Sequence, residues 1–289
     1  MEYEGNVYRP PGEWRSFLIQ TTIGCSHNGC TFCGMYKDKK FRIRPTDEIL
    51  RDIEESAVIY NRYEKIFLCD GDAIIIKTPE LLKIIEKLKR CFPYARLIST
   101  YAGPKSTLTK SPSELKELAA AGLGRAYLGV ESGSDYVLKH TNKGVDSATM
   151  LEAGRRLVEA GIDLWAIVLV GLGGIERSDE HIVATADIIN KMRPNHLSSM
   201  NYTPVMGTKL YDEILEGKFR VLNATESLME TKKLIDNLTV EKLHFTSDHA
   251  SNYLPIKGTL TDDKAKLSAL LQSAIDGKTA IRSEFARGL

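Results

Sequence analysis

The sequence predicts an α/β fold with a mainly parallel sheet, and two observations carry this prediction. Apolar, strand-like runs recur roughly every 30 to 37 residues. Each is followed by an amphipathic helical stretch, which is the alternation that parallel sheets require. Six such units can curl into a barrel segment, and active residues then lie on the loops after the carboxyl ends of the strands.

Expected strands and helices alternate regularly as far as Pro204, and the alternation is less regular after this residue. The expected strands are residues 15–22, 65–69, 96–100, 126–130, 162–170, 196–202 and 242–246. The expected helices are residues 45–61, 111–122, 147–160, 178–192, 209–216, 225–238 and 262–275, with one more that starts at Thr78. We expect an N-terminal extension over residues 1–14, a core barrel over 15–211 and a C-terminal α/β cap over 212–289.

Composition narrows the class of protein. The chain has 289 residues, enough for one large α/β domain, and 39 basic against 38 acidic residues give a net charge of +1. This balance gives no support for a global attraction to nucleic acid or to an anionic membrane. There is no apolar run of membrane-spanning length, and Met1-Glu2-Tyr3-Glu4-Gly5 does not resemble a secretion signal. We therefore expect a cytoplasmic protein without disulfides.

Three cysteines, Cys25, Cys30 and Cys33, lie within nine residues directly after the first expected strand. Thiolates this close together can converge on one soft metal centre. Three ligands without an obvious fourth indicate a centre with an open position, where chemistry takes place. A zinc site that uses His27 as fourth ligand is the alternative, as is a chance cluster. The other cysteines, Cys69 and Cys91, are interpreted as ordinary buried thiols.

This cysteine loop, with Phe32 before its last cysteine, resembles the cluster loop of the radical S-adenosylmethionine (SAM) enzymes. The resemblance implies that the three thiolates hold a [4Fe–4S] cluster whose fourth iron binds SAM, and that the core is a partial (β/α)6 TIM-like barrel. Four residues separate Cys25 from Cys30, whereas three residues are commoner in this family. This difference concerns the subfamily and not the chemistry. Phe32 would then contact the cofactors.

The loop after the second strand, Asp70-Gly71-Asp72-Ala73, aligns with the Gly-Gly-Glu-Pro motif of this family. The resemblance implies that Gly71 and Asp72 meet the amino group of SAM, with the aspartate replacing a glutamate. A carboxylate can provide a charge-assisted acceptor for an ammonium. A plain strand-to-helix turn is the alternative, because Asp-Gly is common in turns.

Three further strand ends resemble the coproporphyrinogen-oxidase-like and methylthiotransferase-like branch. After the fourth strand, the resemblance implies that Glu131 and Ser132 contact the SAM ribose and that Lys143 meets its carboxylate; solvated surface charges are the alternative. After the fifth strand, Leu169 and Gly171 belong to a glycine-rich segment that would approach the adenine. After the sixth, residues 204–211 match a Pro-x-x-Gly-Thr-x-Leu-Tyr segment.

The resemblance implies reductive cleavage of SAM to a 5′-deoxyadenosyl radical, with a flavodoxin or ferredoxin as electron donor. The accessory domains of the methylthiotransferases and a cobalamin-binding domain are not recognised here, and we therefore expect a small organic substrate. Modification of RNA or of a peptide is the second reading. A non-enzymatic zinc or iron–sulfur module for electron transfer is the third.

Substrate residues are expected in the polar loop of residues 246–253. We expect His249, with Asp248 or Asn252, to face the substrate as a proton donor or hydrogen-bonding group. Tyr202, at the end of the sixth strand, is a further candidate for the same cavity. A capping loop with satisfied side chains is the alternative.

Overall fold

The computed structural model describes residues 2–287, and the chain divides into two compact units. The first unit contains the described residues up to Asn28, with Met35–Leu128 and Arg156–Leu164. The second contains Gly29–Gly34, Gly129–Arg155 and the described residues from Trp165 onward. Two strands, β6 (Leu123–Glu131) and β7 (Asp163–Val170), begin in the first unit and end in the second.

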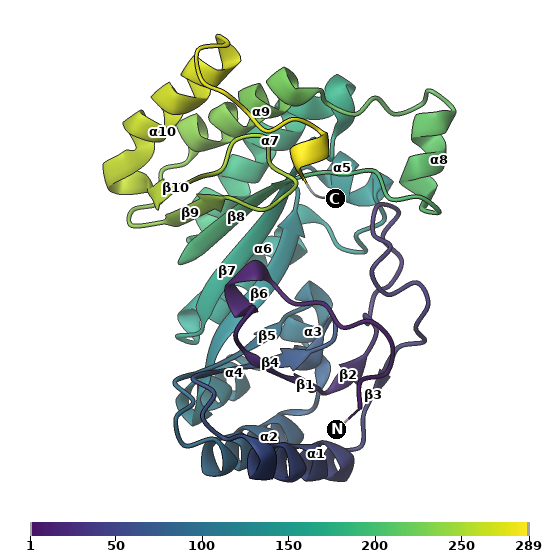
Figure 1. Ribbon diagram of the computed structural model, residues 1–289, viewed down its shortest axis with the longest axis vertical. Coiled ribbons are helices and arrows are strands. Elements are labelled where there is room, and N and C mark those ends of the chain that lie inside the picture. Colours follow the sequence, from purple (N-terminus) through teal and green to yellow (C-terminus); the bar gives the residue numbers. More distant parts are fainter. Residues whose placement is uncertain (1, 288–289) are drawn as a thin grey trace. The chain divides into compact units, whose positions relative to one another are not determined.

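The first unit is built on a parallel sheet in the order β1-β4-β5-β6, with β1 at Phe17–Gln20, β4 at Lys65–Cys69 and β5 at Leu97–Tyr101. Four consecutive residues of β4 are fully buried, as expected for a strand covered on both faces. Helices α1 (Thr46–Ile59), α2 (Thr78–Cys91) and α4 (Pro112–Ala121) pack side by side in this unit (Figure 1). The loops that follow β1 and β4 therefore start from a buried parallel sheet.

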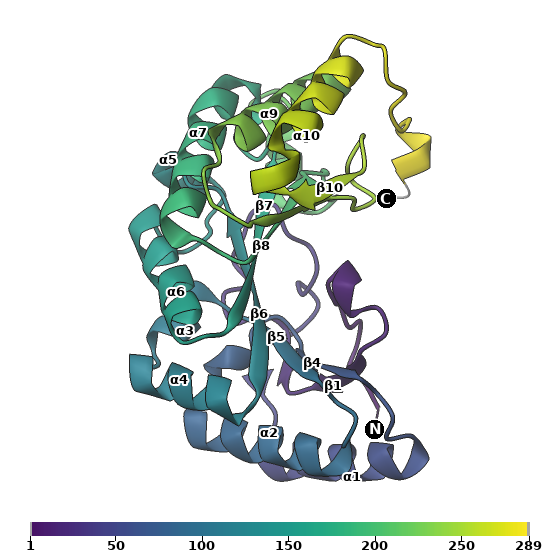
Figure 2. The same ribbon diagram turned by 90° about the vertical axis from the view of Figure 1, so that its left-hand side faces the viewer.

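The second unit continues with the order β7-β8-β9-β10. Strands β8 (His196–Asn201) and β9 (His244–Ser247) run parallel to β7, whereas β10 (Ile256–Thr259) is antiparallel to β9. Helices α7 (Gly174–Met192), α9 (Ala224–Asn237) and α10 (Leu260–Ile275) pack against one another (Figure 2). The remaining elements are η1 (Pro11–Glu13), β2 (Thr22–Ile23), β3 (Arg42–Ile43), η2 (Ala73–Ile75), α3 (Pro104–Leu108), α5 (Asp135–His140), α6 (Ser147–Glu159), α8 (Lys209–Leu215) and η3 (Phe285–Arg287).

The expected alternation of strands and helices is confirmed, with differences that have local causes. The capping box of α4 is present, because Ser111 accepts from the N–H of Glu114 and the Glu114 carboxylate accepts from the N–H of Ser111. Helix α7 begins at Gly174 rather than at Ser178, whose hydroxyl bonds to a glutamate of α9 instead of capping the helix. The short strand β10, expected as loop, forms through its pairing with β9.

Within residues 2–287 we find no helix that combines the length and the apolar composition needed to cross a lipid bilayer.

Packing at one turn gives a test of this fold. A Cβ at Gly133 would lie 2.1 Å from the backbone oxygen of Ala184 in α7, whereas a Cβ at Gly161 has nothing within 4 Å. We expect Gly133→Ala to lower the free energy of unfolding by about 3 kcal/mol, because backbone must move to accept the methyl group. Gly161→Ala should cost only about 1 kcal/mol, from its positive φ alone. Urea unfolding measures both, and equal costs would contradict the packing described.

Candidate active site

The three cysteines follow β1 and β2 in one loop, and all are partly exposed and outside any disulfide. Cys25 belongs to the first unit, whereas Cys30 and Cys33 belong to the second. Throughout the described chain, no three His, Cys, Asp or Glu side chains are close enough to hold a metal ion. Each part of the loop is held by contacts within its own unit.

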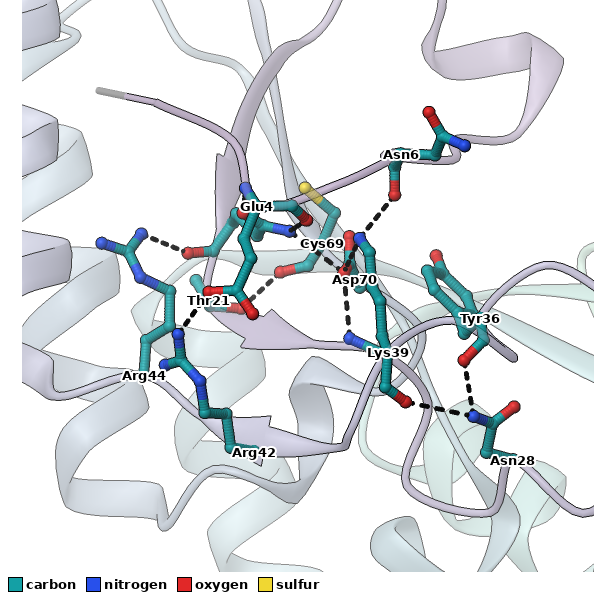
Figure 3. Close-up of polar contacts among 12 residues, drawn as sticks. Glu4, Asn6, Thr21, Asn28, Tyr36, Lys39, Arg42, Arg44, Cys69 and Asp70 are labelled. Carbon is teal, nitrogen blue, oxygen red and sulfur yellow. Dashed lines mark hydrogen bonds and ion pairs between the residues drawn. The ribbon is translucent and has the colours of Figure 1, made fainter.

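In the first unit, Asp70 anchors the loop from the end of β4 (Figure 3). Its fully buried carboxylate oxygen Oδ2 accepts from the N–H of Gly24 at 3.0 Å, from Gln20 Nε2 at 3.1 Å and from Lys39 Nζ at 2.8 Å. Lys39 is also buried, and its ammonium donates to the carbonyl of Asn6 as well. One oxygen thus ties together the residue before Cys25 and a lysine on the far side of the loop.

Gly71 and Asp72 lie beside the same loop. The N–H of Gly71 donates to the Gly24 carbonyl at 3.0 Å, and a Cβ at Gly71 would lie 3.0 Å from the Cβ of Cys25. Asp72 Oδ1 accepts from the N–H of Gly103 at 2.8 Å, while its Oδ2 accepts from the hydroxyls of Ser106 and Ser26. Burial raises the pKa of the Asp72 carboxyl, although these three donors act to lower it. Asp72 therefore connects the residue after Cys25 to the end of β5.

In the second unit, Phe32 lies in a buried apolar cluster, against which Cys30 and Cys33 pack. The members of this cluster are Phe32, Val137, Leu172, Tyr202, Leu210 and Phe219. The backbone of Thr31 is held on both sides, because its N–H donates to the Thr141 carbonyl at 3.0 Å and its carbonyl accepts from the N–H of Leu210 at 2.9 Å. Cys30 and Cys33 are therefore held against this buried apolar cluster.

Glu131 and Lys143 pair at the end of β6. The Lys143 ammonium is 2.8 Å from Glu131 Oε1, and the two side chains are only 13% and 12% exposed. Glu131 has φ = 64°, a conformation that costs a non-glycine residue about 1 kcal/mol or more. A Cβ at Gly129 would lie 2.3 Å from that Oε1, so the absence of a side chain there lets Glu131 fold back over the strand. This ion pair is largely buried, and its two charges are not solvated surface charges.

A buried histidine joins the loops that follow β6 and β7. His181, in α7, has Nδ1 at 2.8 Å from Ser132 Oγ and Nε2 at 2.9 Å from the Leu169 carbonyl. Since a carbonyl only accepts, Nε2 carries the proton and the Ser132 hydroxyl donates to Nδ1. Complete burial lowers the pKa of His181 to about 4, and the ring is therefore neutral at pH 7. Ser132 and Leu169 are fixed relative to each other through this ring.

Glu230, in α9, holds the glycine turn after β7. Its Oε1 accepts from the N–H of Gly171 at 2.7 Å, and its Oε2 accepts from the hydroxyl of Ser178. Gly171 has φ = 84°, which suits glycine. Burial raises the pKa of Glu230 to about 7. His181 Nε2 lies 3.6 Å from Glu230 Oε1, and both acid and base are therefore part of one buried network.

The expected substrate residues lie in the second unit but differ in their surroundings. The His249 ring accepts from the Ser251 N–H at 3.1 Å and lies 2.9 Å from its hydroxyl, and burial lowers the pKa of His249. Asp248 is exposed. Tyr202 is buried, burial raises its pKa to about 12, and its hydroxyl has no hydrogen-bond partner among the described residues. Tyr202 lines a cavity at the end of β8 that has neither His249 nor Asp248 among its described lining residues.

Sequence reasoning missed four residues that organise this site: Asp70 as an anchor, Lys39, His181 and Glu230. Asp70 directly precedes Gly71 in the loop after β4. A second acidic residue at the end of a strand is a sequence signal that points to Asp70. Lys39 lies within the charged run 37–40, and Glu230 and His181 lie on amphipathic helices. Nothing in those patterns distinguishes these side chains from solvated ones.

Comparison with known proteins identifies the family. Residues 19–189, more than half of the chain, match the radical SAM superfamily, and the chain belongs to it. Members of this superfamily use a [4Fe–4S] cluster and SAM. The expected family and its cofactors are thereby confirmed.

Two curated relatives are each 29% identical to this chain. One is 4'-phospho-dehydrooxetanocin synthase from Priestia megaterium, matched over 70% of this chain and 29% of the relative. The other is tRNA-2-methylthio-N(6)-dimethylallyladenosine synthase from Syntrophus aciditrophicus (strain SB), matched over 78% of this chain and 49% of the relative. The chain thus spans less than half the length of either relative.

Solved structures confirm the fold class. A radical SAM methyltransferase from Kitasatospora setae has a TM-score of 0.56 at 19% identity, over 70% of this chain and 39% of that one. Coproporphyrinogen III oxidase from Escherichia coli has a TM-score of 0.51 at 16% identity, over 92% of this chain and 70% of that one. The α/β fold is that of the TIM-like radical SAM barrels.

The Lys39–Asp70 pair yields a stability prediction. Lys39→Met should lower the free energy of unfolding by about 3–5 kcal/mol, because it leaves the buried Asp70 carboxylate without its cation. Lys40→Met, which removes an exposed lysine next to it, should change stability by less than about 0.5 kcal/mol. Urea unfolding followed by circular dichroism measures both. A Lys39→Met variant as stable as Lys40→Met would show that the ion pair does not anchor the loop.

The buried acid and base predict opposing pH dependences. The pKa of Glu230 is about 7, above its ordinary 4.5, and it contributes stability below pH 4.5 that is lost as pH rises through 7. The pKa of His181 is about 4, below its ordinary 6.5, and it contributes stability above pH 6.5 that is lost as pH falls through 4. Glu230→Gln removes only the first effect. Stability of this variant should rise by on the order of 3 kcal/mol between pH 4 and 6.5.

The wild-type protein should change less over the same range, because its two effects oppose each other. Urea unfolding at several pH values measures both proteins, with Glu241→Gln, which changes an exposed glutamate, as the control. Parallel profiles for Glu230→Gln and the wild-type protein would contradict a titrating Glu230.

Proposed function

We propose that this protein is a radical SAM enzyme that reductively cleaves SAM and acts on a small organic substrate. The observation that carries the proposal is the position of the cysteine loop. Three thiols that form no disulfide follow β1 and β2, and the segments expected to contact SAM follow β4, β6 and β7. In barrels of this kind, the carboxyl ends of the strands are where active residues gather.

The residues present fit the implied cofactors. Three thiolates are a suitable donor set for an iron–sulfur cluster with one open position. Gly71 leaves space beside Cys25 that a Cβ would fill. A carboxylate offers about four acceptor positions, and Asp72 uses three, which leaves one for an ammonium. In addition, Asp70 Oδ1 is buried and has no partner among the described residues.

The other residues that we expect to contact SAM have surroundings that support their proposed roles. Phe32 would cover the cofactor from the apolar cluster. Glu131 would accept from the ribose hydroxyls while Lys143 turns to the methionyl carboxylate, an exchange that their mutual ion pair prepares. Ser132 and the backbone of Leu169 and Gly171 would face ribose and adenine, held in place by His181 and Glu230.

When bound, the cluster and SAM supply a 5′-deoxyadenosyl radical that removes hydrogen from unactivated C–H bonds. The chain itself must orient the substrate and exclude water and stray hydrogen donors. Tyr202 is suited to donating a hydrogen bond, because its raised pKa keeps it a phenol at pH 7. We also propose that His249 and Asp248 contact the substrate from outside the cavity that Tyr202 lines, where a neutral His249 can accept or donate a hydrogen bond.

The curated relatives favour two kinds of substrate. One relative is named for a phosphorylated small molecule, and the other for a modified adenosine in tRNA. The net charge of +1 favours the small molecule, because binding to RNA depends on neutralising phosphates with basic residues. We propose that the enzyme works in the cytoplasm with a flavodoxin or ferredoxin as electron donor.

The ligand assignment is tested by removing one thiol. Protein reconstituted with iron and sulfide without oxygen should absorb near about 400 nm, and Cys30→Ala should lose this absorption together with most of its iron. Cys91→Ala, which removes a thiol on α2, should retain both. Iron analysis and absorption spectra provide the readout. A Cys30→Ala variant that keeps its cluster, or wild-type protein that binds zinc instead, would refute the proposal.

A further inference from the structure

The second unit contains a cavity of about 580 Å³ that none of the cofactor contacts above uses. It lies at the carboxyl end of β8, beside the amino end of α9 and against η3. Its main lining residues are Asn201, Tyr202, Asn223, Ser227, Tyr253 and Arg287. We call it the Arg287 cavity. Its volume is in the range of small-molecule sites.

Arg287 presents a fixed guanidinium to this cavity. The residue is 5% exposed, its Nε donates to the Ser251 carbonyl at 2.9 Å, and its Nη1 donates to the Tyr253 hydroxyl at 2.7 Å and to Glu284 at 2.5 Å. The guanidinium also lies over the Tyr253 ring, 4.1 Å from its centroid. Nη2 makes no hydrogen bond to any described residue. The arginine is thus held in place, and the N–H groups of Nη2 are donors that no described residue accepts.

Two buried polar side chains line the same cavity without partners. Asn201, the last residue of β8, is 7% exposed, and Ser227, in the first turn of α9, is 4% exposed. Neither the Asn201 amide nor the Ser227 hydroxyl forms a hydrogen bond with the described part of the chain. The Tyr202 hydroxyl on the same lining is buried and has no hydrogen-bond partner among the described residues. Buried polar groups are nearly always paired, and a ligand in the cavity would pair this hydroxyl together with Asn201 and Ser227.

The amino end of α9 adds backbone donors. Asn223 caps the N–H of Glu226 and accepts with its carbonyl from the N–H of Ser227. The N–H groups of Ala224 and Thr225 belong to the helix start, where no intrahelical partner exists, and Ala224 lines the cavity. Among the described lining residues, Glu284 is the only carboxylate, and it accepts from the Tyr253 hydroxyl and from Arg287. The unused groups facing the cavity are therefore predominantly donors, as an oxyanion requires.

Aromatic rings complete the lining. Tyr202, Tyr253 and Phe285 border the cavity, and Phe285 is 98% exposed. Donors on one side and rings on another suit an organic molecule that carries an anionic group.

We propose that the Arg287 cavity binds the anionic group of the substrate, a carboxylate or a phosphate monoester, with Arg287, Ser227, Asn201 and the α9 amino end as its donors. This inference rests on the proposed function, since it assigns part of the substrate of the same enzyme.

The test uses two anionic probes on the full-length protein as purified. Methyl phosphate and acetate are titrated by calorimetry at constant ionic strength, with chloride as the replaced anion. At least one probe should bind saturably, and Arg287→Gln should weaken it about tenfold, because a charge-assisted contact is lost. Ser227→Ala, which removes no hydrogen bond made within the described chain, should weaken it about threefold to tenfold. Lys278→Gln, which removes an exposed positive charge outside the cavity, is the control.

The preferred probe distinguishes a phosphate ester from a carboxylate. The proposal is overturned if neither probe binds saturably, or if binding is equal in the wild type, Arg287→Gln and Ser227→Ala. Cleavage of SAM by dithionite-reduced protein is measured in parallel and does not depend on this cavity. Absence of SAM cleavage in the wild-type protein would contradict the proposed function. Saturable anion binding that depends on Arg287 would still show that the cavity is an anion site.

Discussion

The geometry of the first half of the site depends on one carboxylate oxygen, Oδ2 of Asp70. It accepts from the backbone N–H of Gly24, immediately before Cys25, and from the ammonium of Lys39, which follows Cys33 in the chain. Both side chains are buried, and water cannot replace either partner. A loop of polar residues would otherwise lose little by moving, because loops at the surface have few buried contacts. The buried pair makes one arrangement of the Cys25 backbone more stable than its alternatives.

In the second unit, the neutral ring of His181 and the buried carboxyl group of Glu230 hold the loops that follow the strands. His181 bonds to Ser132 after β6 and to the Leu169 carbonyl after β7, while Glu230 bonds to the N–H of Gly171. In both units, buried side chains therefore hold the segments that we propose to contact SAM. Such support is what keeps a binding site within the narrow geometry that catalysis needs.

The fold class and the order of the elements could be predicted from sequence, because strands such as 65–69 are bounded by clear helix starts and turns. The cysteine spacing and the motifs at the strand ends were equally visible, since the chemistry requires particular residue types there. Lys39 was not predictable, because its partner lies 31 residues away and only the tertiary structure buries the pair. The Arg287 cavity was missed for the same reason, since its walls come from β8, α9 and η3. The roles of His249, Asp248 and Tyr202 remain predictions.

Helix α9 has a consequence for how two parts of the site behave together. Ser227 borders the Arg287 cavity, and Glu230, three residues later on the same face, grips Gly171. A helix turn is stiff, and any tilt of α9 moves both residues as one body. One turn of this helix therefore positions both a wall of the Arg287 cavity and the carboxylate that holds the glycine turn.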